Sequence, residues 1–402
     1  MDKAAASDAI GGWCRFVALA LATAFVLCAV AAVMIAYRGS VAPDFLSFWA
    51  AGRLVADGQP ALVYDIARHH SVEASAVPGV SLLPFPSPPF VLPLFVPFGI
   101  LPFWIAFAAW LALTAASYLA VTRRWIEARF SLAQAGAGAN FITGQNGFLT
   151  CAIFIAGTRL LGSRPFLAGA VLGLLSFKPQ LCALLPFALI AGREWRAIGG
   201  GIASSLALLS LGLLLFGVGG YWSFLSILPQ FSQWLSIGRW PWGELASTLA
   251  LLSWFGVPKT IALLVHGSIA FGGAALTARA WALKSEQRVE ILAAATLLVP
   301  PYLFTYDALL LTLPLAWLAR KPERQAEFIG VWILALLPAI AYFRPFPNTI
   351  PLAAMLALWA LHREREVIAD PLGASAPTRY KQAPRRPTTG SLFRVPTRSA
   401  SA

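Results

Sequence analysis

Residues 16–36 read FVALALATAFVLCAVAAVMIA, an uncharged run of 21 residues near the amino terminus. A helix rises about 1.5 Å per residue, so roughly 20 apolar residues cross the hydrocarbon core of a bilayer. This run is too long for the apolar part of a cleaved signal peptide, and further apolar runs follow it. It therefore predicts a first membrane span that stays in the protein.

The whole chain has the same character. Its 402 residues are 58% hydrophobic and 12% charged, whereas soluble domains carry about 25% charged residues. A single globular core could not bury so much apolar surface. The composition excludes a soluble enzyme, a nucleic-acid-binding protein and a disordered chain, although the net charge is +13. We expect an all-α polytopic membrane protein.

The uncharged runs, divided where Gly and Pro interrupt them, predict about 12 transmembrane helices. Their approximate bounds are 16–37, 96–121, 131–143, 147–161, 165–177, 180–191, 197–218, 260–283, 289–303, 306–320, 326–343 and 348–362. The third to sixth spans are short and paired. Half-length helices are tolerated only where protein or a water-filled cavity covers their ends.

The basic residues predict the orientation. With both termini in the cytoplasm, 23 of the 30 Lys and Arg lie inside and 7 lie outside, as the positive-inside rule requires. The organisation is then a cytoplasmic amino terminus (1–15), a membrane-embedded domain (16–362) and a basic cytoplasmic tail (363–402) that we expect to be disordered. The domain has long external loops at 38–89 and 217–259.

The first external loop contains APDFLSFWAAGRL at 42–54. Its dense apolar and aromatic residues predict a short helix in the membrane plane from Phe45 to Val55, ended by Asp57 and Gly58. Asp44 precedes this helix. It is either the N-cap or a general base whose pKa is raised by partial desolvation, and the two roles can coexist.

Two external features have a simple interpretation and a functional one. Gly144-Gln145-Asn146 is either a tight turn or a turn whose Gln145 and Asn146 bind sugar hydroxyls. The second external loop is rich in Trp, which indicates either an aromatic belt at the membrane surface or side chains that stack on a sugar or lipid. These residues are Trp222, Trp234, Trp240, Trp242 and Trp254.

Lys178 stands in the apolar segment Ser176-Phe-Lys-Pro-Gln180, between two half-length helices. An ionisable residue near membrane depth indicates a functional site, and an ammonium group there would pair with a phosphate. The alternative is a lysine that reaches to the outer membrane surface.

Asp307, in Thr305-Tyr306-Asp307, is the only acid between Ile291 and Glu323. It is either a site residue or a structural partner for an arginine, such as Arg344 or Arg53. The four histidines form no metal-binding pattern.

These segments together resemble glycosyltransferase family 87. The resemblance rests on segments in the family's order between about residues 40 and 320. They are Asp44–Gln59, Val63-Tyr64-Asp65, Pro86–Phe90, Gly144-Gln145-Asn146, Leu167–Gln180, Arg193–Arg196 and Pro301–Asp307. No single motif is decisive, but the order and spacing agree.

The resemblance implies a C-type membrane glycosyltransferase fold with an external active site and a lipid-phosphate sugar donor. It also implies that the acid of the first external loop, Asp44 here, is the base. Some relatives carry His near Tyr306-Asp307 and this chain does not, so the base is either Asp44 or Asp307. Lys178, helped by Arg53, would stabilise the leaving phosphate.

The further substrate-binding candidates are Gln145, Asn146, Gln180 and Tyr306. Nucleotide sugars are absent outside the cell, so the donor must arrive on a lipid. Direct displacement would invert the anomeric centre. The external acids form no dense cluster for Mg²⁺ or Mn²⁺, so we expect neither metal nor cofactor.

The sequence thus predicts a hexosyltransferase of the bacterial inner membrane, with mannose favoured. Its partners would be a polyprenyl-phosphate sugar, an extracytoplasmic glycan or glycolipid acceptor and membrane lipids, with no nucleic acid. The broken short helices leave a lipid or small-molecule transporter, or a flippase, as the alternative. A non-catalytic scaffold of a glycan-assembly complex is the third possibility.

Overall fold

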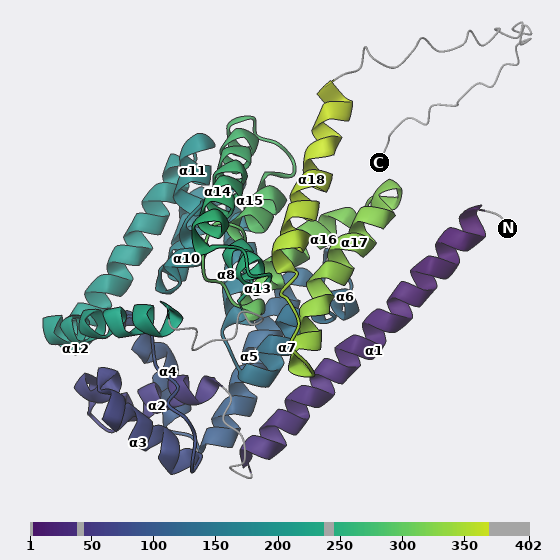
Figure 1. The fold of residues 1–402 in the computed structure, drawn as a ribbon. Coiled ribbons are helices and arrows are strands. Elements are labelled where there is room, and N and C mark those ends of the chain that lie inside the picture. Colours follow the sequence, from purple (N-terminus) through teal and green to yellow (C-terminus); the bar gives the residue numbers. More distant parts are fainter. Residues whose placement is uncertain (1–2, 38–43, 237–244, 370–402) are drawn as a thin grey trace, which may run out of the picture. The chain divides into compact units, whose positions relative to one another are not determined.

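The computed structural model describes residues 3–37, 44–236 and 245–369 (Figure 1). Residues up to Arg363 form one compact unit, and the residues from Glu364 belong to a second. Most of the described residues are helical; the rest form turns, irregular segments and an isolated antiparallel bridge between Leu245 and Phe304. Trp240, Trp242 and the tail beyond residue 369 lie outside the described residues, as do the predictions made for them.

Five helices in the described part of the chain are long and apolar enough to cross a membrane. They are α1 (Lys3–Tyr37), α5 (Phe103–Thr122), α12 (Trp195–Ser236), α14 (Lys259–Ala282) and α17 (Gln325–Leu336) extended by η5 (Pro322–Arg324) and η6 (Leu337–Tyr342). The predicted number of about 12 full spans is therefore not confirmed.

The other predicted spans correspond to shorter or interrupted helices, and further short helices lie in or next to the predicted external loops. In chain order these elements are α2 (Phe45–Ala56), η1 (Pro60–Tyr64), α3 (Ile66–Ala76), η2 (Pro89–Val91), α4 (Leu92–Gly99), α6 (Ala128–Leu132), α7 (Ala135–Thr143), α8 (Gly147–Leu160), α9 (Pro165–Gly173), η3 (Leu174–Phe177), α10 (Pro179–Cys182), α11 (Leu185–Ala191), α13 (Thr248–Trp254), α15 (Arg288–Thr296), η4 (Thr305–Leu311), α16 (Thr312–Leu318) and α18 (Ile350–Ala369). Proline opens η1, α9 and α10, because its ring suits a first helical turn but breaks a longer helix.

Helix α12 is longer than the predicted span at 197–218. It continues to Ser236, so the first part of the predicted loop at 217–259 is helical. Gly217, with φ 65° and ψ 178°, interrupts the helical backbone. The chain changes direction there, and the two parts of α12 run in different directions in Figure 1.

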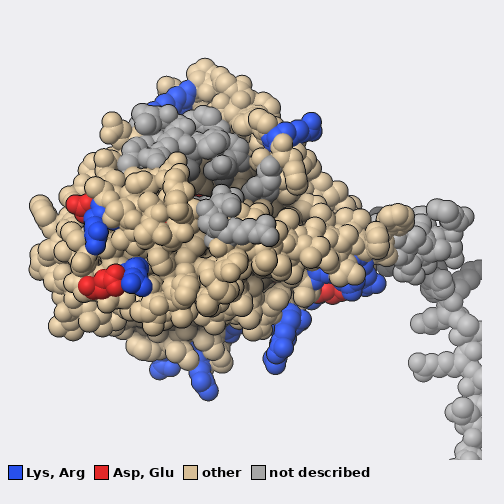
Figure 2. All heavy atoms as spheres, turned by 90° about the horizontal axis from the view of Figure 1, so that it is seen from below, with Lys and Arg blue, Asp and Glu red and all other residues tan. Residues whose placement is uncertain are grey.

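The predicted helix after Asp44 is present as α2, and Gly58 follows its end with φ 73°. Its burial differs from the prediction of a helix lying on the membrane surface, because both of its faces are largely buried. α2 packs on α3 of the first external loop and on α4, which follows that loop, so these neighbouring helices cover it. Seen from below, charged side chains are sparse on the part of the surface that is not grey (Figure 2).

The beginning of α2 is held by an aromatic cluster. Phe45 stacks on Phe107 with ring centroids 5.9 Å apart and on Trp110 at 5.7 Å, and it also contacts Phe103. All four rings are buried. Aromatic pairs at these separations contribute about 0.5–1.5 kcal/mol each, so α5 fixes the position at which α2 begins.

Candidate active site

Asp44 stands at the N-cap position of α2, yet its side chain caps no backbone N–H of that helix. Its Oδ2 instead accepts a hydrogen bond of 3.1 Å from Nε2 of Gln145. Burial raises the pKa of the Asp44 carboxyl above 3.8, and the Gln145 hydrogen bond acts in the opposite direction. A carboxylate with a raised pKa can accept a proton from a hydroxyl group.

Gln145 reaches Asp44 because the turn between α7 and α8 rests on the same aromatic cluster. Gly144 ends α7 in the left-handed region, with φ 67°. Its carbonyl accepts a 2.8 Å hydrogen bond from the indole of Trp110, and a Cβ at this position would lie 2.7 Å from Cβ of Phe45. The predicted tight turn is therefore present, and it also presents Gln145 to the carboxylate.

A residue that the sequence analysis missed, Asn140, joins this turn to the segment around Tyr306. Its Nδ2 donates to the Tyr306 carbonyl at 2.9 Å, and its Oδ1 accepts from the Gly147 N–H at 2.8 Å. A Cβ on Gly147 would overlap the same carbonyl oxygen. An amide directly after the small-residue run 135–139 was the available signal, since small residues let backbones approach closely.

Lys178 and Asp307 form a buried ion pair, with Nζ 2.6 Å from Oδ1. Lys178 lies between η3 and α10, and Asp307 lies in η4. The Lys178 side chain is 9% exposed and that of Asp307 is 2% exposed. The alternative of a lysine reaching to the membrane surface is therefore wrong. The partner of Asp307 is this lysine, and not Arg344 or Arg53.

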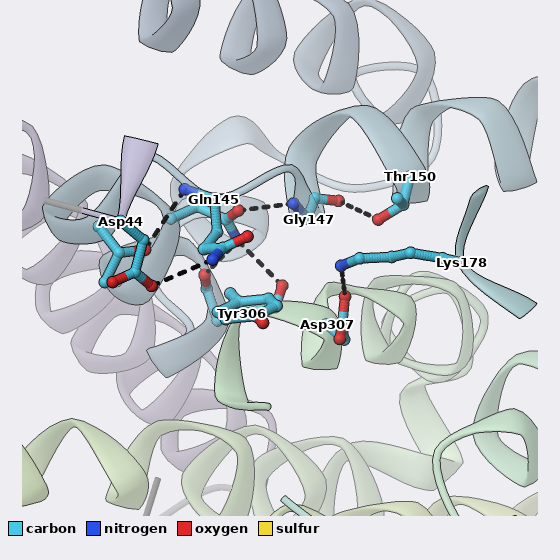
Figure 3. A network of polar contacts seen from close by, with 10 residues as sticks. Asp44, Gln145, Gly147, Thr150, Lys178, Tyr306 and Asp307 are labelled. Carbon is cyan, nitrogen blue, oxygen red and sulfur yellow. Dashed lines mark hydrogen bonds and ion pairs between the residues drawn. The ribbon is translucent and has the colours of Figure 1, made fainter. Parts of the chain in front are cut away.

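Tyr306 lies between the Asp44–Gln145 pair and the Lys178–Asp307 pair (Figure 3). The Lys178 ammonium is 4.8 Å from the centroid of its ring, a cation–π distance. The ring of Phe304 also stacks on that of Tyr306, with centroids 5.3 Å apart and an interplanar angle of 10°. The arrangement places a carboxylate, an aromatic ring and an ammonium group next to one another.

The segment that carries Tyr306 and Asp307 is fixed from two further sides. Ser247 Oγ donates to the Pro301 carbonyl at 2.6 Å, next to the bridge between Leu245 and Phe304. On the other side, Nδ2 of Asn348 donates to Thr305 Oγ1 at 2.7 Å. Ser247 and Asn348, which are distant in the sequence, thus hold the segment that positions the Asp307 carboxylate.

The comparison with known families decides the class of protein. The sequence model of glycosyltransferase family 87 matches residues 85–303, which is more than half of the chain. The chain belongs to glycosyltransferase family 87. No curated protein and no solved structure matches it. With its apolar helices, the chain is a membrane glycosyltransferase, which uses a sugar donor and an acceptor.

The matched region of this family 87 protein contains Gln145 and Lys178, whereas Asp44 lies 41 residues before it and Asp307 lies four residues after it. The family match therefore supports the class of enzyme and leaves the roles of the two acids to the geometry. The transporter alternative gains no support from it.

The remaining residues that the sequence analysis proposed as substrate contacts differ in their burial and in their position relative to Lys178 and Asp44. Asn146 is buried, and its Oδ1 has no hydrogen-bond donor among the residues that the structure describes. Gln180 is half-buried in α10, two residues after Lys178. Arg53 lies on the exposed side of α2, where its Nε is 3.0 Å from Oδ2 of Asp57.

His69 and His70 of the first external loop both contact the carboxylate of Glu73. Glu73 is fully buried and accepts from the Leu83 N–H at 3.2 Å. Its two oxygens also lie 3.5 Å from Nε2 of His69 and 3.3 Å from Nδ1 of His70. Among the described residues, no group of three or more His, Cys, Asp or Glu side chains is arranged to hold a metal ion. Metal independence stays a prediction.

Proposed function

We propose that this enzyme transfers a hexose, with mannose favoured, from a polyprenyl-phosphate sugar to an extracytoplasmic glycan or glycolipid in the bacterial inner membrane. The observation that carries the proposal is the placement of the Asp44 carboxylate and the Lys178 ammonium on either side of Tyr306 (Figure 3). Transfer from a sugar phosphate needs a base for the acceptor and a positive charge for the leaving group.

Asp44 is the proposed base. The acceptor hydroxyl oxygen attacks the anomeric carbon while its proton passes to the Asp44 carboxylate. The bond between that carbon and the phosphate oxygen breaks, and its electron pair leaves with the polyprenyl phosphate. Attack opposite to the leaving group inverts the anomeric centre. The Gln145 hydrogen bond would hold the carboxylate in place during this step.

Lys178 is proposed to bind the phosphate of the donor. A lysine ammonium has three donor hydrogens and no acceptor, so it can keep one contact to Asp307 and offer another to a phosphate oxygen. Asp307 then acts as a positioning residue that holds the Lys178 side chain in place within an apolar bundle. This engagement with Lys178 at 2.6 Å favours Asp44 over Asp307 as the base.

A lipid-linked donor suits the chemistry of the site. Its leaving group carries less charge than a nucleoside diphosphate, so a single cation can stabilise it. The lipid chain would lie against the apolar outer surface of the helices, where α12 exposes many large apolar side chains. Asn146 offers an acceptor to a sugar hydroxyl, and Gln180 and Tyr306 complete the proposed substrate contacts.

Transfer by the purified protein in nanodiscs tests the proposal. Polyprenyl-phosphate-linked mannose, glucose and arabinose would be compared with wild type, Asp44→Asn and Asp57→Asn, an exposed acid in the same loop. We expect release of polyprenyl phosphate by wild type and by Asp57→Asn, and a loss of about 10²–10⁴-fold in Asp44→Asn. A folded wild type that is inert toward every donor would refute the donor class. Full activity of Asp44→Asn would refute the base.

A further inference from the structure

The start of helix α8 has backbone donors without partners. Among the described residues, no acceptor contacts the N–H groups of Phe148 and Leu149, which lie in the first turn of this helix. Phe148 is fully buried and Leu149 is half-buried. Backbone N–H groups that are removed from water are nearly always hydrogen-bonded, because an unpaired one costs about as much free energy as a lost hydrogen bond. The first turn of α8 can therefore donate to a ligand.

The N-cap residue of α8, Asn146, does not satisfy these donors. The side chain of an N-cap asparagine normally accepts from the N–H of the second or third helical residue, but Asn146 makes no such bond. Its φ of −91° and ψ of 13° lie outside the extended region that is typical of capping residues. Asn146 is only 5% exposed, and its Oδ1 accepts from no donor in the described part of the chain. An acceptor and two donors are thus unpaired at the same end of the helix.

This end of α8 lies within the candidate active site. A Cβ on Gly147, the first residue of the helix, would overlap the Tyr306 carbonyl oxygen. The helix packs against η4, which carries Tyr306, and against η3, which ends one residue before Lys178. In Figure 3, Gly147 and Thr150 of the first turn lie between Gln145 and Lys178. Gln145 and Tyr306 are half-buried, so solvent reaches this part of the site.

The ligand that fits this helix end is a phosphate with a hydroxyl group close to it. Helix N-termini bind phosphate because their N–H groups point toward it and because the helix dipole is positive there. The Lys178 ammonium is already balanced by the Asp307 carboxylate, 2.6 Å away, so it does not neutralise a phosphate by itself. Uncharged N–H donors supply the additional stabilisation. The unpaired Oδ1 of Asn146 can accept from a hydroxyl of the attached sugar.

We propose that the first turn of α8 binds the phosphate of the polyprenyl-phosphate sugar, through the N–H groups of Phe148 and Leu149 together with the Lys178 ammonium. This inference rests on the proposed function and extends it, because it adds backbone donors to a phosphate contact assigned there to Lys178 alone. The same donors stabilise the negative charge that collects on the phosphate when its bond to the sugar breaks.

Removal of a single N–H group tests the proposal. Incorporation of leucic acid in place of Leu149 converts the backbone amide into an ester, which removes the N–H and keeps the side chain. Ile261 provides the matched control, because it is likewise the third residue of a helix, α14. No acceptor contacts its N–H among the described residues either. The corresponding ester at Ile261 uses the α-hydroxy acid of isoleucine.

Binding would be measured on the full chain in nanodiscs, with farnesyl phosphate and with farnesol, the same chain without the phosphate. We expect wild type to bind farnesyl phosphate at least about tenfold more tightly than farnesol. The ester at Leu149 should weaken farnesyl phosphate binding about tenfold, as expected for a lost hydrogen bond to a charged group, and leave farnesol binding unchanged. The ester at Ile261 should change neither.

Asn146→Asp gives a second test with an ordinary substitution. Aspartate and asparagine are equally good N-cap residues, so the fold should be kept. The added carboxylate would interact with the helix end itself and repel a phosphate there. Farnesyl phosphate binding should fall about tenfold or more, with the melting temperature unchanged or raised. Gln287→Glu, the same change at the N-cap of α15, is the control and should bind farnesyl phosphate like wild type.

Four results would overturn the proposal. Unchanged farnesyl phosphate binding in either the Leu149 ester or Asn146→Asp, together with a loss in Lys178→Met, would refute the role of α8 and leave the proposed function intact. Equal losses in the two esters would mean a general weakening of the helices. Displacement of farnesyl phosphate by inorganic phosphate at equal concentration would indicate a site for a free anion. A wild type that binds farnesyl phosphate no better than farnesol would refute the proposed donor class, and this inference with it.

Discussion

The ion pair between Lys178 and Asp307 is predicted to affect both the stability of the fold and the transfer reaction. Variants that remove one or both of the charges separate these two effects. Lys178→Met leaves the Asp307 carboxylate buried without its cation. The two side chains are only 9% and 2% exposed and their charged atoms are 2.6 Å apart. Removal of one partner of such a buried pair lowers the free energy of unfolding by about 3–5 kcal/mol. A surface pair would cost at most about 1 kcal/mol.

The double variant Lys178→Met/Asp307→Leu removes both charges together. Replacing a buried ion pair by apolar residues is often neutral or stabilising. We therefore expect Lys178→Met to lower the melting temperature by several degrees and the double variant to recover most of that loss. Its activity should stay about 10²–10³-fold below wild type, because no cation remains for the leaving phosphate.

Thermal unfolding followed by tryptophan fluorescence, together with sugar transfer from a polyprenyl-phosphate donor, measures both effects. Recovery of activity in the double variant would refute the role of Lys178 in phosphate binding. An unchanged melting temperature in Lys178→Met would refute the buried pair itself. Lys178→Arg, which keeps the charge with a different shape, would show whether position or charge matters more.

Four further predictions concern the other half of the site. The activity of wild type should fall as the pH drops through the pKa of Asp44, which burial raises above 3.8. Gln145→Leu should move that acid limb to higher pH, because the lost hydrogen bond stabilised the charged carboxylate; a pH–rate profile with an unshifted limb would contradict this. Asp44→Asn should not lower the melting temperature at neutral pH: a raised pKa means that folding favours the protonated carboxyl, so the charged form weakens the fold as the pH rises through the raised pKa. A clear loss of stability in this variant would make Asp44 a structural residue. Asn140→Leu should cost about 1–3 kcal/mol, since it leaves the Gly147 N–H and the Tyr306 carbonyl without their bridge. An unaltered melting temperature in that variant would exclude the bridge.

Several features were predictable from local sequence because they depend on nearby residues. The apolar runs indicated a membrane protein, and α14 (Lys259–Ala282) agrees closely with the predicted span at 260–283. The helix after Asp44 and its end near Gly58 were predictable for the same reason. Lys178 could be singled out because a charge within an apolar segment is conspicuous.

The predicted number of spans is the part of the fold that stays unconfirmed. Short apolar helices such as α8 (Gly147–Leu160) and α15 (Arg288–Thr296) have the composition of spans but not their length. Their ends are set by turns that other parts of the chain cover, as the Trp110 indole covers Gly144. A hydropathy window contains no information about that cover.

The amino-acid sequence by itself determined that this chain belongs in a membrane, where its long apolar helices lie and which polar residues stand apart from the apolar background. The tertiary structure decided which of those residues meet. Asp44 and Gln145 are 101 positions apart, and Lys178 and Asp307 are 129 positions apart. Such partners are chosen by helix packing, because an isolated buried charge is too costly to leave unpaired, and the pattern around each residue does not say where its partner lies.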